Sequence, residues 1–498
     1  MRLDTTSLLN HRAVAFLAIM FSAVELFAAT PVTFVKTYSN TILNSTLQKE
    51  VTPLGVQTTS DGGYILLAST DCTTNECVIA QGNTNPVMNW LVKTDSSGNT
   101  QWQTELGCLT APPGDYTVGV SVEQTTDGGY IVGGGAFNLD ASCGTSGSAQ
   151  GAIVERLDSG GNLIWSKSYS IGVNGDGITA IKQTADGGFV AAGGVYAIGP
   201  SPNSGLVLKL DASGNLQWQR VVGPMGSITA WFLAIQQTSD GGYVTAGNYY
   251  RSSSQCQPIE CEGGLVVKLD PNGGVQWQHA LNPGLSNSLF IDSLLQTSDG
   301  GYVAAGAWFG STQKGGLLVK LDSSGKIVWQ NAYSGGNDFG VALGTVIYSV
   351  LQTADGGYVL AGDGQDKLVN DELVPWLARV DSKGNLRWER FYFQVNTATG
   401  LPLSEFFAAS DLTPDGGFVA AGLTEDSVTG LGLLFVVKTD NFGQCGICSD
   451  VHPDFGLTAV NPAVKASPVS LPVHTPTTPG VNSPSQTRPT AVITKQDC

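Results

Sequence analysis

The sequence predicts an all-β fold that is built from seven copies of one four-stranded antiparallel unit, and three observations carry this prediction. An Asp-Gly-Gly-aromatic tetrad recurs at intervals of 66, 59, 54, 59, 56 and 60 residues. A second motif, Lys/Arg-x-Asp-x-x-Gly, follows each tetrad, and in six copies a Trp stands four residues after its Gly. Short runs rich in Val, Ile, Leu and aromatic residues separate the motifs, as expected for strands between tight turns.

The tetrad marks the first tight turn of each unit. Its aspartates are Asp61, Asp127, Asp186, Asp240, Asp299, Asp355 and Asp415. Asp-Gly supplies the positive-φ residues that a turn between antiparallel strands requires. We expect each carboxylate to accept hydrogen bonds from its own turn, and its repetition in every unit favours a structural role over a catalytic one.

The second motif marks the second turn and the last strand of each unit. The tryptophans that follow it are Trp102, Trp165, Trp218, Trp277, Trp329 and Trp388. The Lys/Arg and the Asp of this motif are expected to pair with each other beside the turn. Gly/Ala runs such as Ala304-Ala305-Gly306 lack side-chain bulk, so the Trp of the same or the next unit is expected to pack there. Units of this kind and length are typical of β-propeller blades.

The seventh unit departs from the pattern because Cys445 and Cys448 stand where its Trp strand is expected. The segment from Thr33 to Ser39 resembles the segments that follow the other tryptophans, with Phe34 in the Trp position. We therefore expect the N-terminal strand to complete the last blade, which closes the ring and protects an open sheet edge. The predicted propeller is a seven-bladed ring over residues 30–444.

The two ends of the chain differ from the repeats. Residues 1–29 carry Arg2 and Arg12 before an apolar stretch at 13–24, which predicts a secretory signal peptide; an uncleaved anchor is the alternative. The protein is then secreted or at the cell surface, with the periplasm possible, and has no stable membrane span after cleavage. Residues 445–460 form a Cys-containing segment, and residues 461–498 are rich in Pro, Ser and Thr. We expect this last segment to be a solvated tail or stalk that joins no strand ladder.

Charge and cysteine content narrow the function classes. The 24 Lys and Arg against 41 Asp and Glu give a net charge of −17 without a basic cluster, so nucleic-acid binding is not expected. Export favours disulfides, and the spacing gives four candidate pairs: Cys72–Cys77, Cys108–Cys143, Cys256–Cys261 and Cys445–Cys448. Cys445-Gly-Ile-Cys448 lacks the second pair or following His of a metal or haem site, so no metal is predicted there. The odd Cys498 can pair between chains.

The singular acidic residues are the candidates for ligand binding. They are Asp115, Asp176, Asp338 and Glu405, in loops on the face opposite the Asp-Gly-Gly turns. They could hold Ca²⁺ at the mouth of the central channel, although solvated loop acids are the simpler interpretation because no dense Asp-x-Asp-x-Asp loop exists. No catalytic residue and no other cofactor is predicted. His279 is expected at the surface, at the end of a strand.

The Gln-Thr-x-Asp-Gly-Gly-Tyr-x-x-Ala-Gly pattern resembles a group of exported prokaryotic repeat proteins, the delta-60-like propellers, most of which have no assigned function. The Asp-x-x-Gly-x-x-x-Trp turn is similar to the tryptophan-docking motif of quinoprotein-type propellers. The resemblance implies a propeller fold and transfers no catalytic residue. Quinoprotein dehydrogenases use adjacent cysteines at their cofactor, which this sequence lacks, and the spacing from Asp95 to Trp102 is longer than in a sialidase Asp-box.

These observations favour a secreted or cell-surface binding or scaffold module, which is not an enzyme, for a glycan, a protein or another cell surface. The expected recognition surface is the loop face that carries Cys72, Cys108, Cys143 and Cys256, because rigid scaffolds present function on loops. One alternative is a secreted glycan hydrolase or lyase with its site at the channel mouth. Another is a surface-layer or adhesion component, with the tail as its stalk.

Overall fold

The computed structural model is all-β in the residues it describes. These are 32–41, 49–71, 87–107, 116–139, 149–169, 176–195, 203–223, 228–251, 261–282, 288–310, 314–334, 345–366, 372–393, 403–426, 429–445 and short strands between 451 and 496. The chain divides into two compact units, Met1–Pro31 and Val32–Cys498, and only the second contains described residues. Within those residues no helix is long and apolar enough to cross a membrane.

The repeats fold into groups of four antiparallel strands, which we call sheets 1 to 7 in chain order; sheets 2 and 3 are joined by one pairing, Gly135 opposite Gly177. Sheets 1 to 3 consist of β2 (Glu50–Thr58), β3 (Tyr64–Asp71), β4 (Met88–Thr94), β5 (Thr100–Gly107); β6 (Tyr116–Gln124), β7 (Tyr130–Leu139), β8 (Ala149–Leu157), β9 (Leu163–Tyr169); and β10 (Asp176–Gln183), β11 (Phe189–Val195), β12 (Ser204–Leu210), β13 (Leu216–Val222). Sheets 4 and 5 consist of β14 (Ile228–Gln237), β15 (Tyr243–Arg251), β16 (Cys261–Leu269), β17 (Val275–Asn282); and β18 (Ser288–Gln296), β19 (Tyr302–Phe309), β20 (Lys314–Leu321), β21 (Ile327–Ser334). Sheets 6 and 7 consist of β22 (Val346–Gln352), β23 (Tyr358–Asp366), β24 (Glu372–Val380), β25 (Leu386–Tyr392); and β26 (Ser404–Leu412), β27 (Phe418–Glu425), β28 (Gly432–Thr439) with β1 (Phe34–Thr41).

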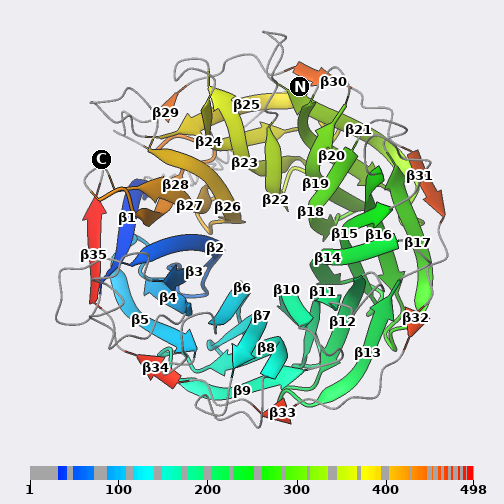
Figure 1. The fold of residues 1–498 in the computed structure, drawn as a ribbon. Helices are drawn as coiled ribbons and strands as arrows, with labels where there is room; N and C mark the ends of the chain where they lie inside the picture. The colour runs from blue at the N-terminus through cyan, green and yellow to red at the C-terminus, as the bar shows by residue number, and fades with distance from the viewer. Residues whose placement is uncertain are drawn as a thin grey trace, which may run out of the picture. The chain divides into compact units, whose positions relative to one another are not determined.

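The first strand of each sheet is its innermost one. Each first strand contacts the first strand of the next sheet, from β2 through β6, β10, β14, β18 and β22 to β26, and β26 contacts β2 (Figure 1). The apolar core lies between neighbouring sheets: one buried cluster joins Val303 of sheet 5 to Tyr358 of sheet 6, and another joins Tyr64 of sheet 1 to Val436 of sheet 7. The stability of this unit therefore rests on contacts between sheets.

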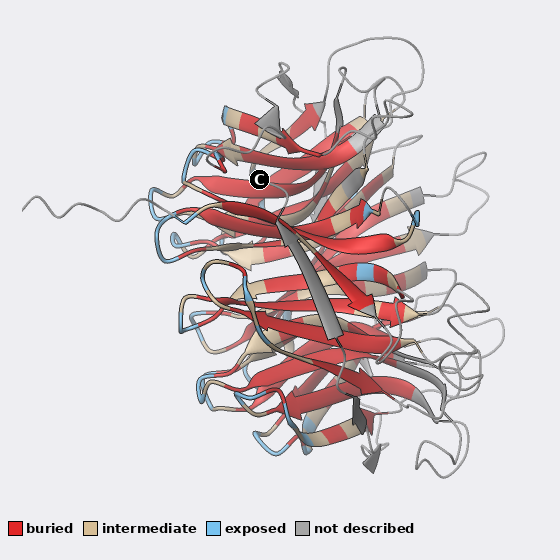
Figure 2. Ribbon diagram, turned by 90° about the vertical axis from the view of Figure 1, so that its left-hand side faces the viewer, coloured by how far each residue is buried: buried red, intermediate tan, exposed pale blue. Residues whose placement is uncertain are grey.

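The Asp-Gly-Gly turns have the chemistry that the sequence predicts. In sheet 1 the Asp61 carboxylate accepts hydrogen bonds from the Thr59 hydroxyl at 2.5 Å and the Gly63 N–H at 3.1 Å. Gly62 has a φ of +81°, which favours glycine, and a Cβ on Gly63 would lie 2.0 Å from the Thr94 carbonyl oxygen. Both glycines are therefore required for different reasons. The exposed residues gather at the turns, at one end of the strands (Figure 2).

The partner of the Lys/Arg in the second motif corrects our expectation. Lys93 pairs with Asp61 of the first turn, with 2.8 Å between Nζ and Oδ2, rather than with Asp95 of its own motif. Asp95 instead accepts the N–H groups of Ser97 and Asn99 at 2.9 and 2.8 Å. The two residues face different turns, because Lys93 lies on β4 opposite Ile65 whereas Asp95 follows the strand. The repeated Lys and Asp side chains thus stabilise the two turns by an ion pair and by hydrogen bonds to backbone N–H groups.

Each Trp packs on the Gly of the second turn in the next sheet. The sequence left open whether the Trp packs on its own unit or on the next one. A Cβ on Gly161 would lie 2.7 Å from the Trp102 ring, and one on Gly214 would lie 2.7 Å from the Trp165 ring. The Gly/Ala runs have another role: a Cβ on Gly306 would lie 2.0 Å from the carbonyl oxygen of Phe290, on the inner strand of its own sheet. The bare backbone at Gly306 makes room for a neighbouring strand of its own sheet. In the run of sheet 3, a Cβ on Gly194 would lie 2.1 Å from an indole, but this is the ring of Trp231 on the first strand of sheet 4, not the Trp of a last strand.

His279 is not a surface residue at a strand end, as the sequence led us to expect. It lies within β17, is 9 % exposed, and its Nε2 is 3.1 Å from the carbonyl oxygen of Ser324 in the next sheet. In sheet 2 the residue at the same offset from the Trp is Lys167, and it makes the corresponding contact: its Nζ donates to the Ser213 carbonyl of the next sheet at 2.7 Å. His279 is therefore part of the contact between sheets 4 and 5.

The predicted pairing between the two ends of the repeat region is present. β1 runs antiparallel to β28, with Phe34 opposite Lys438, just as Trp102 lies opposite Lys93 in sheet 1. A Cβ on Gly98 of sheet 1 would lie 2.7 Å from the Phe34 ring, and Tyr38 donates to the Gly98 carbonyl at 2.6 Å. Phe34 thus takes the place of the absent seventh Trp.

The C-terminal segment differs from the solvated tail that we expected. Seven short strands pair antiparallel with the outermost strands: β29 (Val451–His452) with β25, β30 (Thr458–Val460) with β21, β31 (Lys465–Pro468) with β17, β32 (Val473–His474) with β13, β33 (Val481–Asn482) with β9, β34 (Gln486–Arg488) with β5 and β35 (Ala491–Gln496) with β1 (Figure 1). Proline excludes a chain from the middle of a sheet but is tolerated on an edge strand, which needs ladder bonds on one side only. The segment therefore joins the ladders as a fifth strand of each sheet.

Candidate functional site

Two of the four residues that the sequence singled out as ligands fall outside the described part of the chain, and the side chains of the other two are not described. Asp115 and Asp338 are not described, and Asp176 at the start of β10 and Glu405 within β26 are placed by their backbone alone. No group of three or more metal-ligating side chains occurs among the described residues. The predicted calcium site stays a prediction.

The predicted disulfides and the loop face are likewise undescribed. Cys72, Cys77, Cys108, Cys143, Cys256, Cys448 and Cys498 lie outside the described residues. Cys261 opens β16, opposite Arg251, with its side chain undescribed. Cys445 is buried against Tyr392 and Phe407, beside the end of sheet 7. The Cys445–Cys448 bridge and the other candidate pairs therefore stay predictions.

A cavity of about 730 Å³ lies between the seven innermost strands. In each first strand, one residue faces the neighbouring sheet. It lies four residues before the Asp of the Asp-Gly-Gly turn. Gln57 accepts the Gln124 N–H at 2.6 Å, and Glu123 accepts the Gln183 N–H at 2.6 Å. Asp411 accepts the Thr58 N–H at 2.8 Å, which joins sheet 7 to sheet 1. Each of these side chains accepts a hydrogen bond from the backbone of the next sheet, so its role is structural.

Lys182 holds the corresponding position in sheet 3 and cannot accept a hydrogen bond. It lines the cavity with Glu123 and Asp411, and its ammonium forms no ion pair with any residue in the described ranges. Burial raises the pKa of Glu123, and the positive charge of Lys182 opposes this effect. The pKa of Asp411 shifts in the same direction because of burial, against the hydrogen bonds from Thr58 and Leu412. The cavity thus contains one cation and carboxyl groups that resist ionisation.

A second acidic group lies between sheets 5 and 6. The first strand of each sheet has a β-bulge, and the bulged residues of β18 and β22 are Asp292 and Tyr348. The residues at the equivalent bulge of the other five first strands are Leu54, Val120, Thr179, Leu233 and Ala408, and β26 has a second register shift at Glu405. Tyr348 donates to the Asp363 carboxylate at 3.3 Å. Burial, with a smaller contribution from Asp363, raises the pKa of Asp292 to about 7, and burial also raises the pKa of Asp363 to about 6.

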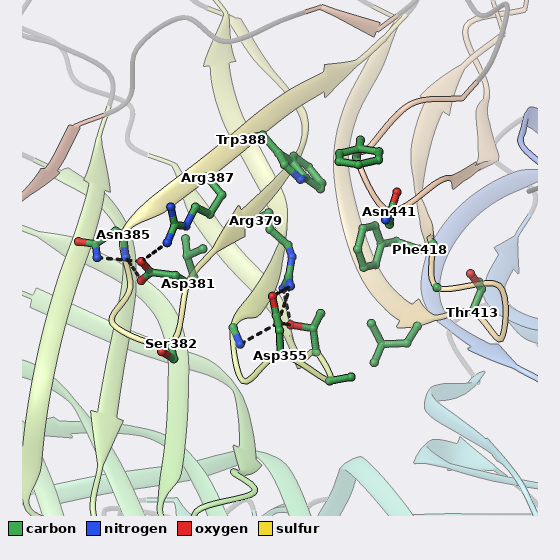
Figure 3. A pocket seen from close by; sticks show the side chains of 18 of the residues that line it. Asp355, Arg379, Asp381, Ser382, Asn385, Arg387, Trp388, Thr413, Phe418 and Asn441 are labelled. Carbon is green, nitrogen blue, oxygen red and sulfur yellow. Dashed lines mark hydrogen bonds and ion pairs between the residues drawn. The ribbon is translucent and has the colours of Figure 1, made fainter. Parts of the chain in front are cut away.

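A larger hollow, of about 1030 Å³, opens between the turns of sheets 6 and 7. Its walls are the two turns of sheet 6 at 353–357 and 381–385, the first turn of sheet 7 at 412–418, and the second turn of sheet 7 at 441–442. Figure 3 shows Arg379 extending between the Asp381 turn and the wall that holds Phe418 and Asn441. We call this hollow the 6/7 groove.

The carboxylates in the 6/7 groove are held by cations. Arg379 pairs with Asp355 at 2.6 Å and also donates to the Thr353 hydroxyl. The hydrogen bonds from Thr353 and Arg379 hold the pKa of Asp355 far below its ordinary value. Arg387 pairs with Asp381 at 2.9 Å while 63 % of its side chain stays exposed. Both acids are therefore ionised at neutral pH, and their role is to position the two arginines.

The 6/7 groove differs from the rest of the repeat at three positions. The position of Lys383 is Ser97, Gly160, Ser213, Asn272 and Ser324 in sheets 1 to 5. The position of Arg387 is Gln101, Ile164, Gln217, Gln276 and Val328 in the same sheets. Phe442 takes the place of those small residues in sheet 7 and is 61 % exposed, the one exposed aromatic ring in the described ranges. Two added cations and an exposed ring thus converge on one hollow.

Sequence reasoning missed every one of these residues. A comparison of the second-turn positions across the seven units would have found Lys383, Arg387 and Phe442, because each departs from small or neutral residues. Asp292 and Asp363 give no such signal, because the bulge that carries Asp292 and the burial of Asp363 appear only in the folded chain.

Comparison with known proteins supports the fold. A quinoprotein-type family model, PQQ_2, described as Outer membrane protein assembly factor BamB, matches residues 262–389, which is less than half of the chain. No curated protein matches. A protein of unknown function from Dyadobacter fermentans DSM 18053 aligns with 12% identity over 82% of this chain and 100% of that chain, at a TM-score of 0.41.

Two further solved structures have similar, weak likenesses. Sqt1 from Chaetomium thermophilum aligns with 13% identity over 76% of this chain and 84% of that chain, at a TM-score of 0.36. A xylan beta-1,4-xylosidase from Bacillus halodurans C-125 aligns with 12% identity over 78% of this chain and 87% of that chain, at a TM-score of 0.25. Likenesses at these TM-scores carry no argument about fold or activity. The family match over residues 262–389 and the four-stranded antiparallel units together give this chain a β-propeller fold.

Proposed function

We propose that this chain is an exported, seven-bladed β-propeller that acts as a binding module, and that its ligand is a saccharide held in the 6/7 groove. The pairing of β1 with β28 and the contact of β26 with β2 support a ring that the N-terminal strand closes. The basic, apolar N-terminus supports export. A closed ring is a rigid scaffold on which a few singular side chains can hold a ligand.

The observation that carries this proposal is the exposed Phe442 ring on the wall of a hollow that also contains Asn385 and Asn441. The other sheets place Ser, Gly, Asn or Lys at this position, so the turn does not need the phenyl ring in order to form. A flat ring beside several hydrogen-bonding groups suits the apolar face and the hydroxyls of a sugar. Repeated residues build the turn, whereas the singular residues leave their polar and aromatic surface to a ligand.

The test is a glycan array followed by calorimetry on the mature protein. We expect a set of oligosaccharides to bind and the Phe442→Ser variant to lose most of the affinity with an unchanged melting temperature, because Ser occupies this position in sheets 1, 3 and 5. Ile164→Ser, which removes an exposed apolar side chain from sheet 2, is the matched control and should bind as the wild type does. Binding that survives Phe442→Ser contradicts this site.

The second candidate is a secreted glycan hydrolase or lyase, and the group formed by Asp292, Tyr348 and Asp363 favours it. Two carboxyls that titrate near neutrality are the kind of groups that general acid–base catalysis requires. Release of reducing or unsaturated ends from polysaccharides, with loss of that activity in Asp292→Asn and Asp363→Asn, would establish the enzyme. Retention of the polysaccharide without cleavage favours the binding module.

A further inference from the structure

We infer that the saccharide bound in the 6/7 groove carries a carboxylate, as a uronic acid does. This inference rests on the proposed function and names the class of its ligand. The groove is lined by three cationic side chains, Arg379, Lys383 and Arg387, against two acidic ones, Asp355 and Asp381. A local excess of positive charge is unexpected in a chain whose net charge is −17.

Lys383 supplies a charge that the protein does not use for its own structure. Its side chain is exposed, and its ammonium forms no ion pair with the residues that the structure describes. Only its backbone N–H is engaged, with the Asp381 carboxylate at 2.9 Å. The turn therefore closes in the same way with Ser in this position, as it does in sheets 1, 3 and 5.

Arg387 supplies donors with a fixed direction. One Nη2–H of its guanidinium binds Asp381, so the remaining N–H groups of this largely exposed side chain are available to a ligand. Asp381 is 19 % exposed and also accepts a hydrogen bond from the Asn385 amide at 2.9 Å. The ion pair thus orients a planar donor group, and a planar carboxylate is the partner that matches it.

The aromatic and the cationic parts belong to one hollow. Phe442, Lys383 and Arg387 all line the 6/7 groove, Phe442 from sheet 7 and the two cations from the second turn and last strand of sheet 6. A uronic acid presents an apolar ring face on one side and a carboxylate at one edge. The arrangement therefore fits an acidic sugar better than a neutral sugar or a simple inorganic anion, because only the acidic sugar uses both features.

The test measures binding of galacturonate, glucuronate and guluronate oligomers, each as the free acid and as the uncharged methyl ester. We expect at least one free acid to bind about tenfold more tightly than its own ester, and this advantage to shrink when salt is raised from 50 to 500 mM. Lys383→Ser and Arg387→Gln should each reduce acid binding about tenfold and reduce ester binding much less, so that the advantage of the acid over its ester shrinks. Lys326→Asn, which removes an exposed Lys from the second turn of sheet 5, is the matched control and should change neither.

The outcomes separate this inference from the proposed function. Equal affinity for an acid and its ester, with both lost in Phe442→Ser, overturns the acidic ligand and leaves a saccharide site in place. Strong binding of neutral sugars alone likewise overturns the acidic ligand and leaves a saccharide site in place. The absence of binding by every acid and every ester, together with an empty glycan array, overturns both. An advantage of the acid that Lys383→Ser and Arg387→Gln do not reduce shows that the acid binds elsewhere.

Discussion

Phe34 offers a quantitative test of how the ends of the repeat region are joined. Its side chain is 3 % exposed and packs on Gly98, where a Cβ would lie 2.7 Å from the ring. Its ring also meets the Tyr64 ring edge-on, with 6.0 Å between the centroids and 64° between the planes. Phe34→Ala removes both contacts but leaves the backbone pairing of β1 and the hydrogen bond from Tyr38 to Gly98.

The expected cost of Phe34→Ala is about 3–4 kcal/mol in the free energy of unfolding, because truncation of a buried Phe typically costs 3–5 kcal/mol. About 1 kcal/mol of this belongs to the edge-on ring contact. Phe34→Trp should stay within about 1 kcal/mol of the wild type, because six other sheets place Trp on the equivalent Gly.

The assay is equilibrium unfolding in urea, followed by tryptophan fluorescence and by limited proteolysis of the N-terminal strand. Val32→Ala is the control, because Val32 lies on the same segment and is 45 % exposed. A loss below about 1 kcal/mol for Phe34→Ala would refute the reasoning, because a buried ring that joins two sheets cannot be removed at so small a cost. So would a Phe34→Trp variant as unstable as Phe34→Ala.

Three further predictions concern pH and the C-terminal segment. The hydrogen bonds and ion pairs of the Asp-Gly-Gly turns, acting against burial, lower the pKa values of Asp61, Asp186, Asp240 and Asp299 to about 2. Their contribution to stability is complete above pH about 4 and is lost as pH falls towards 2, so the melting temperature should drop in that window; a flat profile contradicts this. The raised pKa of Asp292, about 7, has the opposite effect on stability. Because the folded protein keeps this carboxyl protonated, stability is lost as pH rises from about 4 through 7. Asp292→Asn should therefore be more stable than the wild type by about 2 kcal/mol in urea unfolding at pH 8, after allowance for its partial solvent access, with no difference at pH 4; equal stability at pH 8 counts against a buried carboxyl. Removal of residues 451–498 frees one edge of each outermost strand, so amide exchange in β21 and β17 should accelerate and the melting temperature should fall by several degrees. Unchanged exchange in both strands would show that the fifth strands do not form in solution.

The repeated residues made most of the fold predictable from sequence. Asp-Gly-Gly fixes a turn through local hydrogen bonds and glycine geometry, so its position in the sequence is its position in the structure. The replacement of the seventh Trp by Phe34 was also predictable, because the segment around it matches those that follow the other tryptophans. The packing partner of each Trp could not be predicted from the sequence, because the sheet that contains the Trp and the next sheet both have small residues on which it could pack.

The remaining misses have physical causes. Lys93 was expected beside Asp95 from their spacing, yet the antiparallel pairing of β3 and β4 brings it to Asp61. The prolines of the C-terminal segment argued against strands, but edge strands tolerate proline and the outermost strands provided edges. Asp292 became a candidate only through its bulge and burial, and the 6/7 groove only through the meeting of two sheets.

The central claim is that the repeat builds the fold and that the residues that break the repeat bind the ligand. The most direct measurement uses one variant, Lys383→Ser with Arg387→Gln and Phe442→Ser, which restores the residues of the other sheets. We expect it to melt within about 3 °C of the wild type, because none of the three side chains is buried. In calorimetry it should bind the acidic oligosaccharide at least a hundredfold more weakly. A variant that melts normally and retains the wild-type affinity would contradict the account.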